Sequence, residues 1–404
     1  MIDQLLSSTN KLKKKMTNYD FDQPYERRGT DSEKWAAYGS DVLPLWVADM
    51  DFPAPPAVLE ALHDRVTHGI FGYGGVTAEL SEAICNRLWE HYQWKVTPDQ
   101  IVFQPGLVSA LNVSCRAVCP PGTGVLVQTP VYPPFLSAPV NQGLQLNVAE
   151  LTVTRSSQSL QYSIDFNAFE AAIQPNTRLF MLCNPHNPVG RCFSREELTN
   201  IADICIRHDL IICADEIHCD ILLDQSRHLP IATLSPEIAK RCITLMAPSK
   251  TFNIAGLYCG FAIIQDPALR KQYQQAANGI VPHVNLLGLT AALAAYTHCE
   301  TWHKELLAYL KGNRDFLVDY VQEHLPILRT TIPEGTFLAW LDCSAAGITG
   351  NPYEFFLRQA KVALNDGQRF GQGGKDFVRL NFGCSRATLA QALMQMKVAL
   401  DSLN

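Results

Sequence analysis

The sequence contains no CxxC pair among its 13 cysteines, so the common spacing of a zinc site or a thiol redox motif is missing. The cysteine count is odd and no secretory signal peptide is recognisable, which argues against a disulfide framework. Several cysteines lie inside apolar runs, where a free thiol behaves as a small hydrophobe. We therefore expect free thiols, no bound metal and a reducing compartment, the cytoplasm.

The sequence also lacks a strong charge bias and a long apolar run. Its formal net charge is −6, which gives no electrostatic basis for binding nucleic acid or an anionic membrane. No apolar run reaches the roughly 18 residues that a membrane-spanning helix needs. What remains is a chain of 404 residues, 47% hydrophobic and 18% charged, which is long enough for two domains and typical of a soluble enzyme. Residues 1–15 include a lysine-rich stretch with no apolar segment typical of a leader, so we predict a disordered extension there, or translation from an upstream start codon.

Two apolar runs are followed by residues that can carry chemistry. Residues 210–214 form a short run of the kind found in a buried parallel strand, and Asp215 follows directly. Residues 242–246 form a second run, and Lys250 follows shortly after it. Because ligands bind at the carboxyl ends of strands in α/β sheets, both side chains are candidates for one crevice. A lysine held away from water beside an acid can act as a neutral nucleophile and base, although each residue taken alone fits an ordinary loop acid or surface lysine.

Other strand ends carry distinctive turns. Residues 101–111 have the pattern of a strand, a turn and a helix start, with Gly106 placed where helix amides can bind an anion. A later strand is followed by Tyr132, which is either a ring-stacking or a structural aromatic. The string NPHNPVG contains two Asn-Pro steps that predict a stiff turn around Asn187. Strands alternate with helices from about residue 100 to 265, which predicts a mostly parallel sheet with helices on both faces.

The two ends of the chain predict a second, smaller α+β domain. Residues 283–325 have a long helical pattern that would link this domain to the large one, and two strands follow. The second strand carries Arg379, which can bind a carboxylate through two parallel hydrogen bonds or form a surface ion pair. We predict an N-terminal arm over residues 16–60 that joins the small domain, a large domain over residues 61–295 and the small domain over residues 296–404.

These units together resemble the fold type I pyridoxal-phosphate enzymes, a superfamily that includes the class I and II aminotransferases. Four candidate residues each follow their own strand in the family order: Tyr132, Asn187, Asp215 and Lys250. The resemblance implies that Lys250 forms the Schiff base with pyridoxal 5′-phosphate and acts as general base, while Asp215 keeps the ring nitrogen protonated. It also implies that Asn187 donates to the phenolic oxygen of the ring and that Tyr132 lies on the ring and takes part in catalysis. The resemblance runs from about residue 21 to the C-terminus.

The same resemblance implies the remaining contacts of cofactor and substrate. Further residues expected near the cofactor are Gly106, Leu107, Val108, Ser249, His218 and, from the partner of a homodimer, Tyr73. Arg379 and the backbone of Val47 and Ala48 would contact the substrate carboxylate. A simple turn and an edge strand are the alternative interpretations of the segments around Tyr73 and Val47. Family turns of the NPHNPVG kind often hold a cis peptide, and Asn187–Pro188 is the candidate here.

Within the superfamily, the sequence resembles the cystathionine β-lyase or C–S lyase branch most. The string LWVADMDF at residues 45–52 is typical of these lyases, and Tyr258 stands where many aminotransferases carry a phosphate-binding arginine. The resemblance implies α,β-elimination of cystathionine or cysteine S-conjugates to a thiol, pyruvate and ammonia, by a homodimer with shared active sites. An aminotransferase is the first alternative. A regulatory protein–protein partner that retains the fold is the second.

Overall fold

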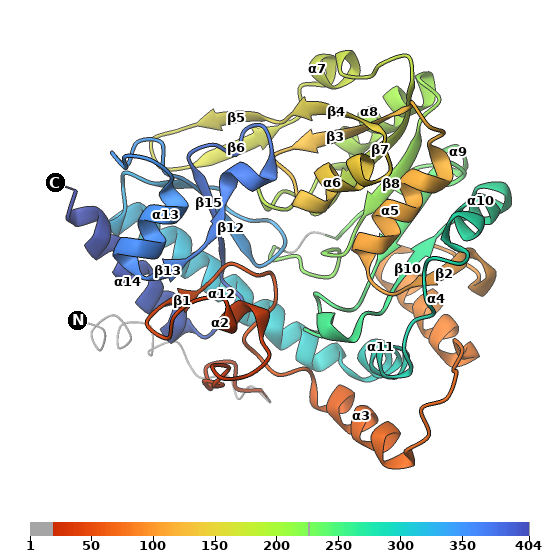
Figure 1. Cartoon of the computed structure of the whole chain (residues 1–404), viewed down its shortest axis with the longest axis horizontal. Helices are drawn as coiled ribbons and strands as arrows, with labels where there is room; N and C mark the ends of the chain where they lie inside the picture. The colour runs from red at the N-terminus through yellow and green to blue at the C-terminus, as the bar shows by residue number, and fades with distance from the viewer. Residues whose placement is uncertain (1–18, 225–226, 404) are drawn as a thin grey trace.

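The computed structural model describes residues 19–224 and 227–403. The extension predicted over residues 1–15 lies outside these residues. A seven-stranded sheet forms the centre of the larger part of the molecule (Figure 1). Its strands in spatial order are β2 (Ile101–Gln104), β10 (Gly260–Ile263), β9 (Cys242–Met246), β8 (Ile211–Asp215), β7 (Thr177–Cys183), β3 (Gly124–Thr129) and β4 (Gln145–Glu150).

The inner strands of this sheet are parallel and apolar on both faces. The five strands from β9 to β4 pair in parallel, whereas β10 is antiparallel to both of its neighbours. The strand predicted over residues 242–246 is confirmed as β9, and all five of its residues are buried. The strand predicted over residues 210–214 is β8, shifted by one residue so that Asp215 is its last member. The expectation of a mostly parallel sheet is confirmed, because apolar runs buried on both faces suit parallel strands.

Helices cover both faces of the large sheet (Figure 1). One face packs against α5 (Leu107–Val118), α6 (Pro133–Asn141) and α10 (Pro267–Ala277). The opposite face packs against α4 (Ala78–Tyr92), α7 (Phe166–Ala171), α8 (Arg195–Arg207), the short α9 (Pro236–Ala239) and α11 (Leu286–His298). Two separate apolar cores result, one on each side of the sheet, as in other α/β proteins of three layers.

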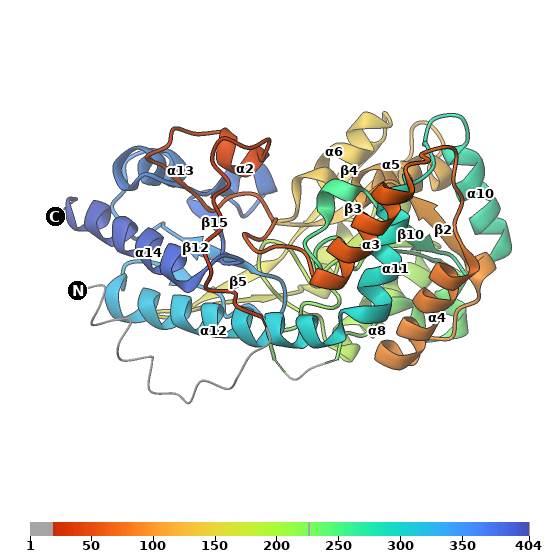
Figure 2. The same cartoon turned by 90° about the horizontal axis from the view of Figure 1, so that it is seen from below.

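A second, antiparallel sheet forms the smaller part of the molecule. Its strands in order are β11 (Arg329–Thr330), β12 (Leu338–Asp342), β15 (Phe377–Asn381) and β14 (Asn365–Asp366), with α12 (Glu300–His324), α13 (Pro352–Phe355) and α14 (Arg386–Asp401) packed around them. The N-terminal segment joins this part, because β1 (Leu43–Pro44) pairs with β13 (Val362–Ala363) and Phe21, Leu45 and Phe52 enter its core. Figure 2 shows α12 running along the smaller part toward α11 and the larger part. The exact division at residues 60 and 295 stays a prediction.

The helical pattern over residues 283–325 is divided into two helices, α11 and α12. The break falls at Cys299, whose φ of −111° and ψ of 16° lie outside helix geometry. Neither glycine nor proline marks this break in the sequence, so no local signal predicted it. Among the described residues, no helix is long and apolar enough to cross a membrane.

Candidate active site

Four neighbouring parallel strands of the large sheet present their carboxyl ends at one edge. One residue predicted for the site lies at or just beyond the end of each strand: Lys250 after β9, Asp215 as the last residue of β8, Asn187 after β7 and Tyr132 after β3. Arg379 comes from β15 of the smaller sheet, and its guanidinium donates to the side chain of Asn187. Both parts of the molecule therefore contribute to one site, at the sheet edge where α/β proteins bind ligands.

Asp215 is a buried carboxylate without a charged partner in contact. Its Oδ1 accepts a hydrogen bond from the backbone N–H of Ile217 at 3.1 Å. No ion pair within 4 Å of Asp215 occurs in the described part of the chain. Burial raises the pKa of Asp215 to about 7, against the opposing effects of the Ile217 amide and the charge of Lys250. A cationic group placed against this carboxylate would offset the cost of its burial, which suits the protonated ring nitrogen of pyridoxal phosphate.

Lys250 lies between charges of both signs. Its Nζ donates to the carbonyl oxygen of Ala48 at 2.6 Å, which joins the end of β9 to the N-terminal segment. Burial lowers the pKa of Lys250 to about 8, and the positive charge of Arg379 acts in the same direction. The carboxylates of Asp49 and Asp215 oppose this shift. A substantial fraction of the amine is therefore neutral just above neutral pH, as a nucleophile or base requires.

Arg379 is fixed by several contacts at once. Its Nη1 donates to Asn187 Oδ1 at 3.0 Å, and its Nη2 donates to the carbonyl of Trp46 at 2.9 Å and to Asn365 Oδ1. The guanidinium also lies over the ring of Phe370, 5.1 Å from its centroid. Its Nε is buried and has no partner in the described part of the chain, and its Nη1 uses one of two N–H groups, which leaves two donors for a ligand. Burial lowers the pKa of Arg379 to about 10, so the group is still cationic at neutral pH.

The turn that carries Asn187 is built as predicted. The Asn187–Pro188 peptide is cis, which confirms the expectation, and the Thr129–Pro130 and Asn184–Pro185 peptides are cis as well. The backbone N–H of Tyr132 donates to the carbonyl of Asn187 at 3.1 Å, which ties the turns after β3 and β7 together. Because Asn187 Oδ1 already accepts from an arginine, its amide nitrogen is the atom left to donate to a ligand.

Histidine and tyrosine side chains at the site are held in their neutral forms. His218 is buried, its Nδ1 has no partner in the described part of the chain, and its ring packs edge-on against Phe337 at 5.9 Å. Burial lowers the pKa of His218 to about 3, and the charges of Lys250 and Arg379 add to the effect. Burial raises the pKa of Tyr132. His218 is therefore not a cationic proton donor near neutral pH, and the catalytic role expected of Tyr132 stays a prediction.

The start of α5 offers an anion site. Gly106 precedes the helix with a φ of 93°, and a Cβ at this position would come within 3.4 Å of the ring of Tyr258. The positive φ is what favours glycine here, because a Cβ at this position would meet only ordinary van der Waals contact. The first amides of the helix, at Leu107 and Val108, have no acceptor within the helix and can bind a phosphate. Ser249, the residue before the predicted catalytic lysine, is partly exposed.

Two asparagines that no sequence motif singles out hold the N-terminal segment against the site. Asn253 accepts from the N–H of Met50 at 2.9 Å and donates to the carbonyl of Phe52 at 2.6 Å. Asn381 donates to the carbonyl of Val47 at 2.5 Å. Asn253 comes three residues after the predicted catalytic lysine, and Asn381 comes two residues after the predicted carboxylate-binding arginine. That proximity in sequence was the available signal.

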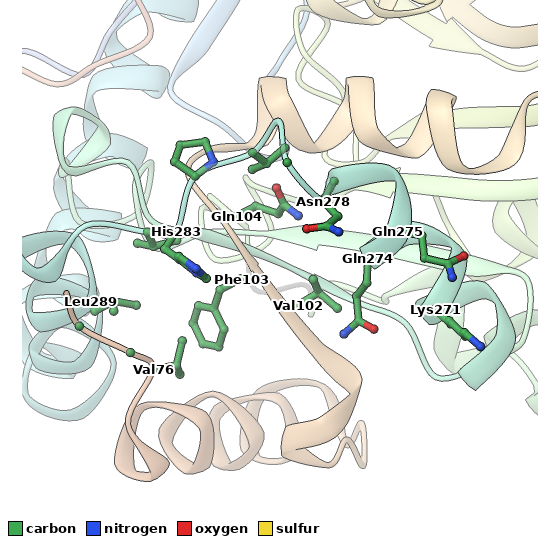
Figure 3. Close-up of a pocket in the computed structure, with 17 residues that line it drawn as sticks. Val76, Val102, Phe103, Gln104, Lys271, Gln274, Gln275, Asn278, His283 and Leu289 are labelled. Carbon is green, nitrogen blue, oxygen red and sulfur yellow. The ribbon is translucent and has the colours of Figure 1, made fainter.

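Tyr73 is the predicted cofactor residue that the structure does not bring to the others. Its side chain is fully exposed, in the segment between α3 (Pro56–His68) and α4. Beside this segment lies a surface cavity of about 650 Å³, formed by Val76, Gln104, Asn278 and His283 among others (Figure 3). None of the residues from the strand ends at Asp215 and Lys250 lines this cavity. This cavity is therefore separate from the candidate catalytic groups.

Comparison with known proteins agrees with the geometry along nearly the whole chain. The sequence pattern of the family described as "Aminotransferase class I and II" matches residues 40–395. The chain is 40% identical to "Cystathionine beta-lyase PatB" of Bacillus subtilis, over 95% of this chain and 100% of the relative. The structure is similar to that of cystalysin from Treponema denticola, which contains pyridoxal 5′-phosphate, with 31% identity, a TM-score of 0.91 and coverage of 96% and 100%. It is also similar to a C–S lyase with bound pyridoxal phosphate from Staphylococcus hominis, with 32% identity, a TM-score of 0.89 and coverage of 95% and 99%.

Proposed function

The chain belongs to the aminotransferase class I and II family, and on this basis we propose that it is a pyridoxal-phosphate-dependent carbon–sulfur lyase. Its reaction is the α,β-elimination of cystathionine or a cysteine S-conjugate to a thiol, pyruvate and ammonia. The observation that carries the proposal is the match to a cystathionine β-lyase over the full length of that relative, at 40% identity. The buried acid at Asp215, the low-pKa amine at Lys250 and the anion site before α5 fit the cofactor.

The residues of the chain divide the chemistry between them. When bound, pyridoxal phosphate supplies an electron sink for the negative charge that develops at the substrate Cα. Arg379 binds the substrate α-carboxylate and so orients the Cα–H bond, while Asp215 holds a proton at the ring nitrogen. The neutral Nζ of Lys250 takes the Cα proton, because a pKa near 8 leaves a usable fraction of free amine.

Loss of the Cα proton then allows the Cβ–S bond to break. The sulfur leaves with the bonding electron pair as a thiolate, which takes up a proton. Water completes the reaction, so that R–S–CH₂–CH(NH₃⁺)–COO⁻ and water give R–SH, pyruvate and ammonium. The hydroxyl of Tyr132, which is partly buried, and the neutral imidazole of His218 line the site but carry no net charge near neutral pH.

Incubating the purified protein with L-cystathionine tests the function directly. We expect pyruvate and free thiol in equal amounts without any keto-acid acceptor. The same reaction with an added keto acid serves as the comparison, because an aminotransferase turns over only when an acceptor is present. Turnover that depends on the keto acid and releases no thiol would show that the aminotransferase alternative is correct. No turnover under either condition would favour a non-catalytic role.

We also propose that the enzyme is a homodimer with shared active sites. Ile70 and Phe71 are strongly exposed and Tyr73 fully so, in a segment next to the cavity of Figure 3. Exposed apolar side chains gathered in one segment favour burial against another protein surface. A second copy that covers this face would carry Tyr73 to the phosphate end of the neighbouring site. Since Tyr258 replaces a cationic phosphate ligand, a hydroxyl from the partner gains importance there.

Replacing Tyr73 by phenylalanine is expected to weaken retention of pyridoxal phosphate severalfold and to leave the dimer intact. The physical reason is the loss of one hydrogen bond to the phosphate, without a change in the apolar contact area. Equilibrium dialysis gives the dissociation constant, and sedimentation velocity gives the assembly state. Tyr25→Phe, another exposed tyrosine, is the matched control. An unchanged constant, or a parent protein that is active as a monomer, would contradict the shared site.

We place the enzyme in a reducing compartment, the cytoplasm. All 13 cysteines are free in the structure, and 11 of them are buried. Burial raises the pKa of thiols such as Cys183 and Cys205, which keeps them protonated and poorly reactive. Thiols of this kind need no oxidising environment for stability.

A further inference from the structure

The backbone carbonyls of residues 45–49 in the N-terminal segment alternate between two sets of partners. Those of Leu45, Val47 and Asp49 all accept hydrogen bonds from a single residue, Asn381 on β15. The backbone N–H of this asparagine donates to the first carbonyl at 2.9 Å, and its side-chain Nδ2 donates to the second at 2.5 Å and to the third at 2.6 Å. One residue of the smaller sheet therefore holds every second carbonyl of this stretch.

The two carbonyls between them accept from the candidate catalytic groups. The carbonyl of Trp46 accepts from Arg379 Nη2 at 2.9 Å. The carbonyl of Ala48 accepts from Lys250 Nζ at 2.6 Å. Ala48 therefore lies between the two carbonyls that the Asn381 side chain holds. Because each peptide unit is planar and rigid, fixing the carbonyls on both sides of Ala48 leaves its own carbonyl little freedom to turn away from the amine.

The side chain of Asn381 is fully buried, and both ends of its amide are engaged. Its Oδ1 accepts from the backbone N–H of Gly383 at 2.7 Å, which fixes the rotation of the amide group. Both N–H groups of Nδ2 are then available to the two carbonyls. The carbonyl of Asp49 has a second, longer contact with Lys34 Nζ at 3.4 Å. Within residues 19–224 and 227–403, the carbonyl of Val47 accepts from Asn381 alone.

We propose that Asn381 is a positioning residue that holds the Ala48 carbonyl against the amine of Lys250, so that the general base keeps one place in the site. This inference rests on the proposed function, in which Nζ takes the Cα proton; Asn381 itself transfers no proton. Arg379, which binds the substrate carboxylate in that function, lies two positions before Asn381 on the same strand. The strand β15 thus sets the positions of both groups. A misplacement of about 1 Å between such groups can cost a factor of about 100 in rate.

A purely structural role is the alternative, and Asn313 on α12 provides a matched comparison. Its side chain is equally buried, and its Nδ2 also donates to two carbonyls that lie two positions apart, of Phe382 at 3.0 Å and of Cys384 at 2.8 Å. Among the described residues, it donates to no carbonyl of residues 45–49. Loss of either amide removes the same kind of contact from the smaller part of the molecule, but only Asn381 holds the segment beside the amine.

The test compares Asn381→Leu with Asn313→Leu, because leucine has nearly the shape of asparagine but makes no side-chain hydrogen bond. Each apoprotein is labelled with trace acetic anhydride at pH 8, and peptide mass spectrometry measures the acetylation of Lys250 relative to the exposed Lys271 of the same sample. The Ala48 carbonyl stabilises the unreactive ammonium form of the amine. In Asn381→Leu this acceptor is no longer fixed, and the ratio should rise severalfold over the parent. In Asn313→Leu the ratio should match the parent, at a similar loss of thermal stability.

An unchanged labelling ratio in a folded Asn381→Leu would overturn the proposal. An equal rise in Asn313→Leu would also overturn it, because the effect would then come from a general loosening of the smaller part. Asn381→Ser, which keeps one hydroxyl donor, takes the place of the leucine variant should that variant fail to fold, and its ratio should also exceed that of the parent. If neither variant folds, Asn381 supports the fold and its assignment as a positioning residue is wrong. The labelling needs no substrate, so these results are independent of the assay with L-cystathionine.

Discussion

Lys250→Ala is expected to lower the rate of pyruvate formation from L-cystathionine by about 10²- to 10⁴-fold or more, the range that positioned general bases contribute. The amine of Lys250 is the one basic nitrogen of the site with a pKa near neutrality, because Arg379 stays cationic and His218 has a pKa of about 3. No neighbouring group in the described chain can therefore replace it. The measurement is the initial rate of pyruvate release at saturating substrate. Borohydride treatment should also fix pyridoxal phosphate to the parent protein and not to the variant.

Lys271→Ala provides the control for this change. Lys271 is exposed on α10 and lines the separate cavity of Figure 3, away from the strand ends that carry the site. This variant should keep the activity of the parent. If Lys250→Ala were folded and as active as the control, the assignment of the catalytic lysine would be wrong.

The strand ends were predictable because their signal is local. A buried parallel strand is a short apolar run, and β9 matches the predicted run at both ends. The residue that follows such a run lands at the ligand-binding edge of the sheet, whatever the rest of the chain does. Asp215, Lys250 and Asn187 were found in this way. The family order of these residues then supplied roles that spacing alone does not contain.

The contacts between the two parts of the molecule could not be predicted in the same way. Asn253 and Asn381 hold the N-terminal segment across more than 200 positions of sequence, and no periodic pattern marks a single asparagine as such a contact. The pairing of Lys34 with Asp51 depends on complete burial of the lysine, which is a tertiary property. The neutrality of His218 also follows from burial and from two cations brought near it by folding. Composition and spacing carry none of this information.

The single helical pattern expected over residues 283–325 differs from the structure, which has two helices there, and the reason is physical. The pattern over residues 283–325 is long and helical, and neither glycine nor proline stands at the position of Cys299 to end a helix. The chain nevertheless turns there, because α11 packs partly on the large sheet, through Leu289 and Ala292, whereas α12 packs only in the core of the smaller part. Packing on two separate cores overrides local helix propensity at this point.

Asp215→Asn is expected to lower activity by about 10²- to 10⁴-fold, since breaking a buried ion pair costs roughly 3–5 kcal/mol and each 1.4 kcal/mol is a factor of ten. An amide cannot hold a proton at the ring nitrogen, so the negative charge at Cα loses its stabilisation. Pyruvate release gives the size of the loss. Asp203→Asn, an acid of the same size on α8, is the matched control and should stay active.

Asp215→Asn should also stabilise the apoprotein at alkaline pH. A gain in stability would show that the loss of activity does not come from damage to the fold. Burial raises the pKa of Asp215 from 3.8 to about 7, so the folded chain holds a proton that the unfolded chain releases. The cost of the buried charge is absent below pH 3.8, grows as the pH rises and is complete above pH 7. Asp215→Asn removes this cost, and its apoprotein should therefore melt at a higher temperature than the parent at pH 8, with the difference shrinking toward pH 4. If the variant lost activity and were also less stable than the parent at pH 8, Asp215 would be a residue that stabilises the fold. Its buried charge would then not be a cost that the cofactor offsets.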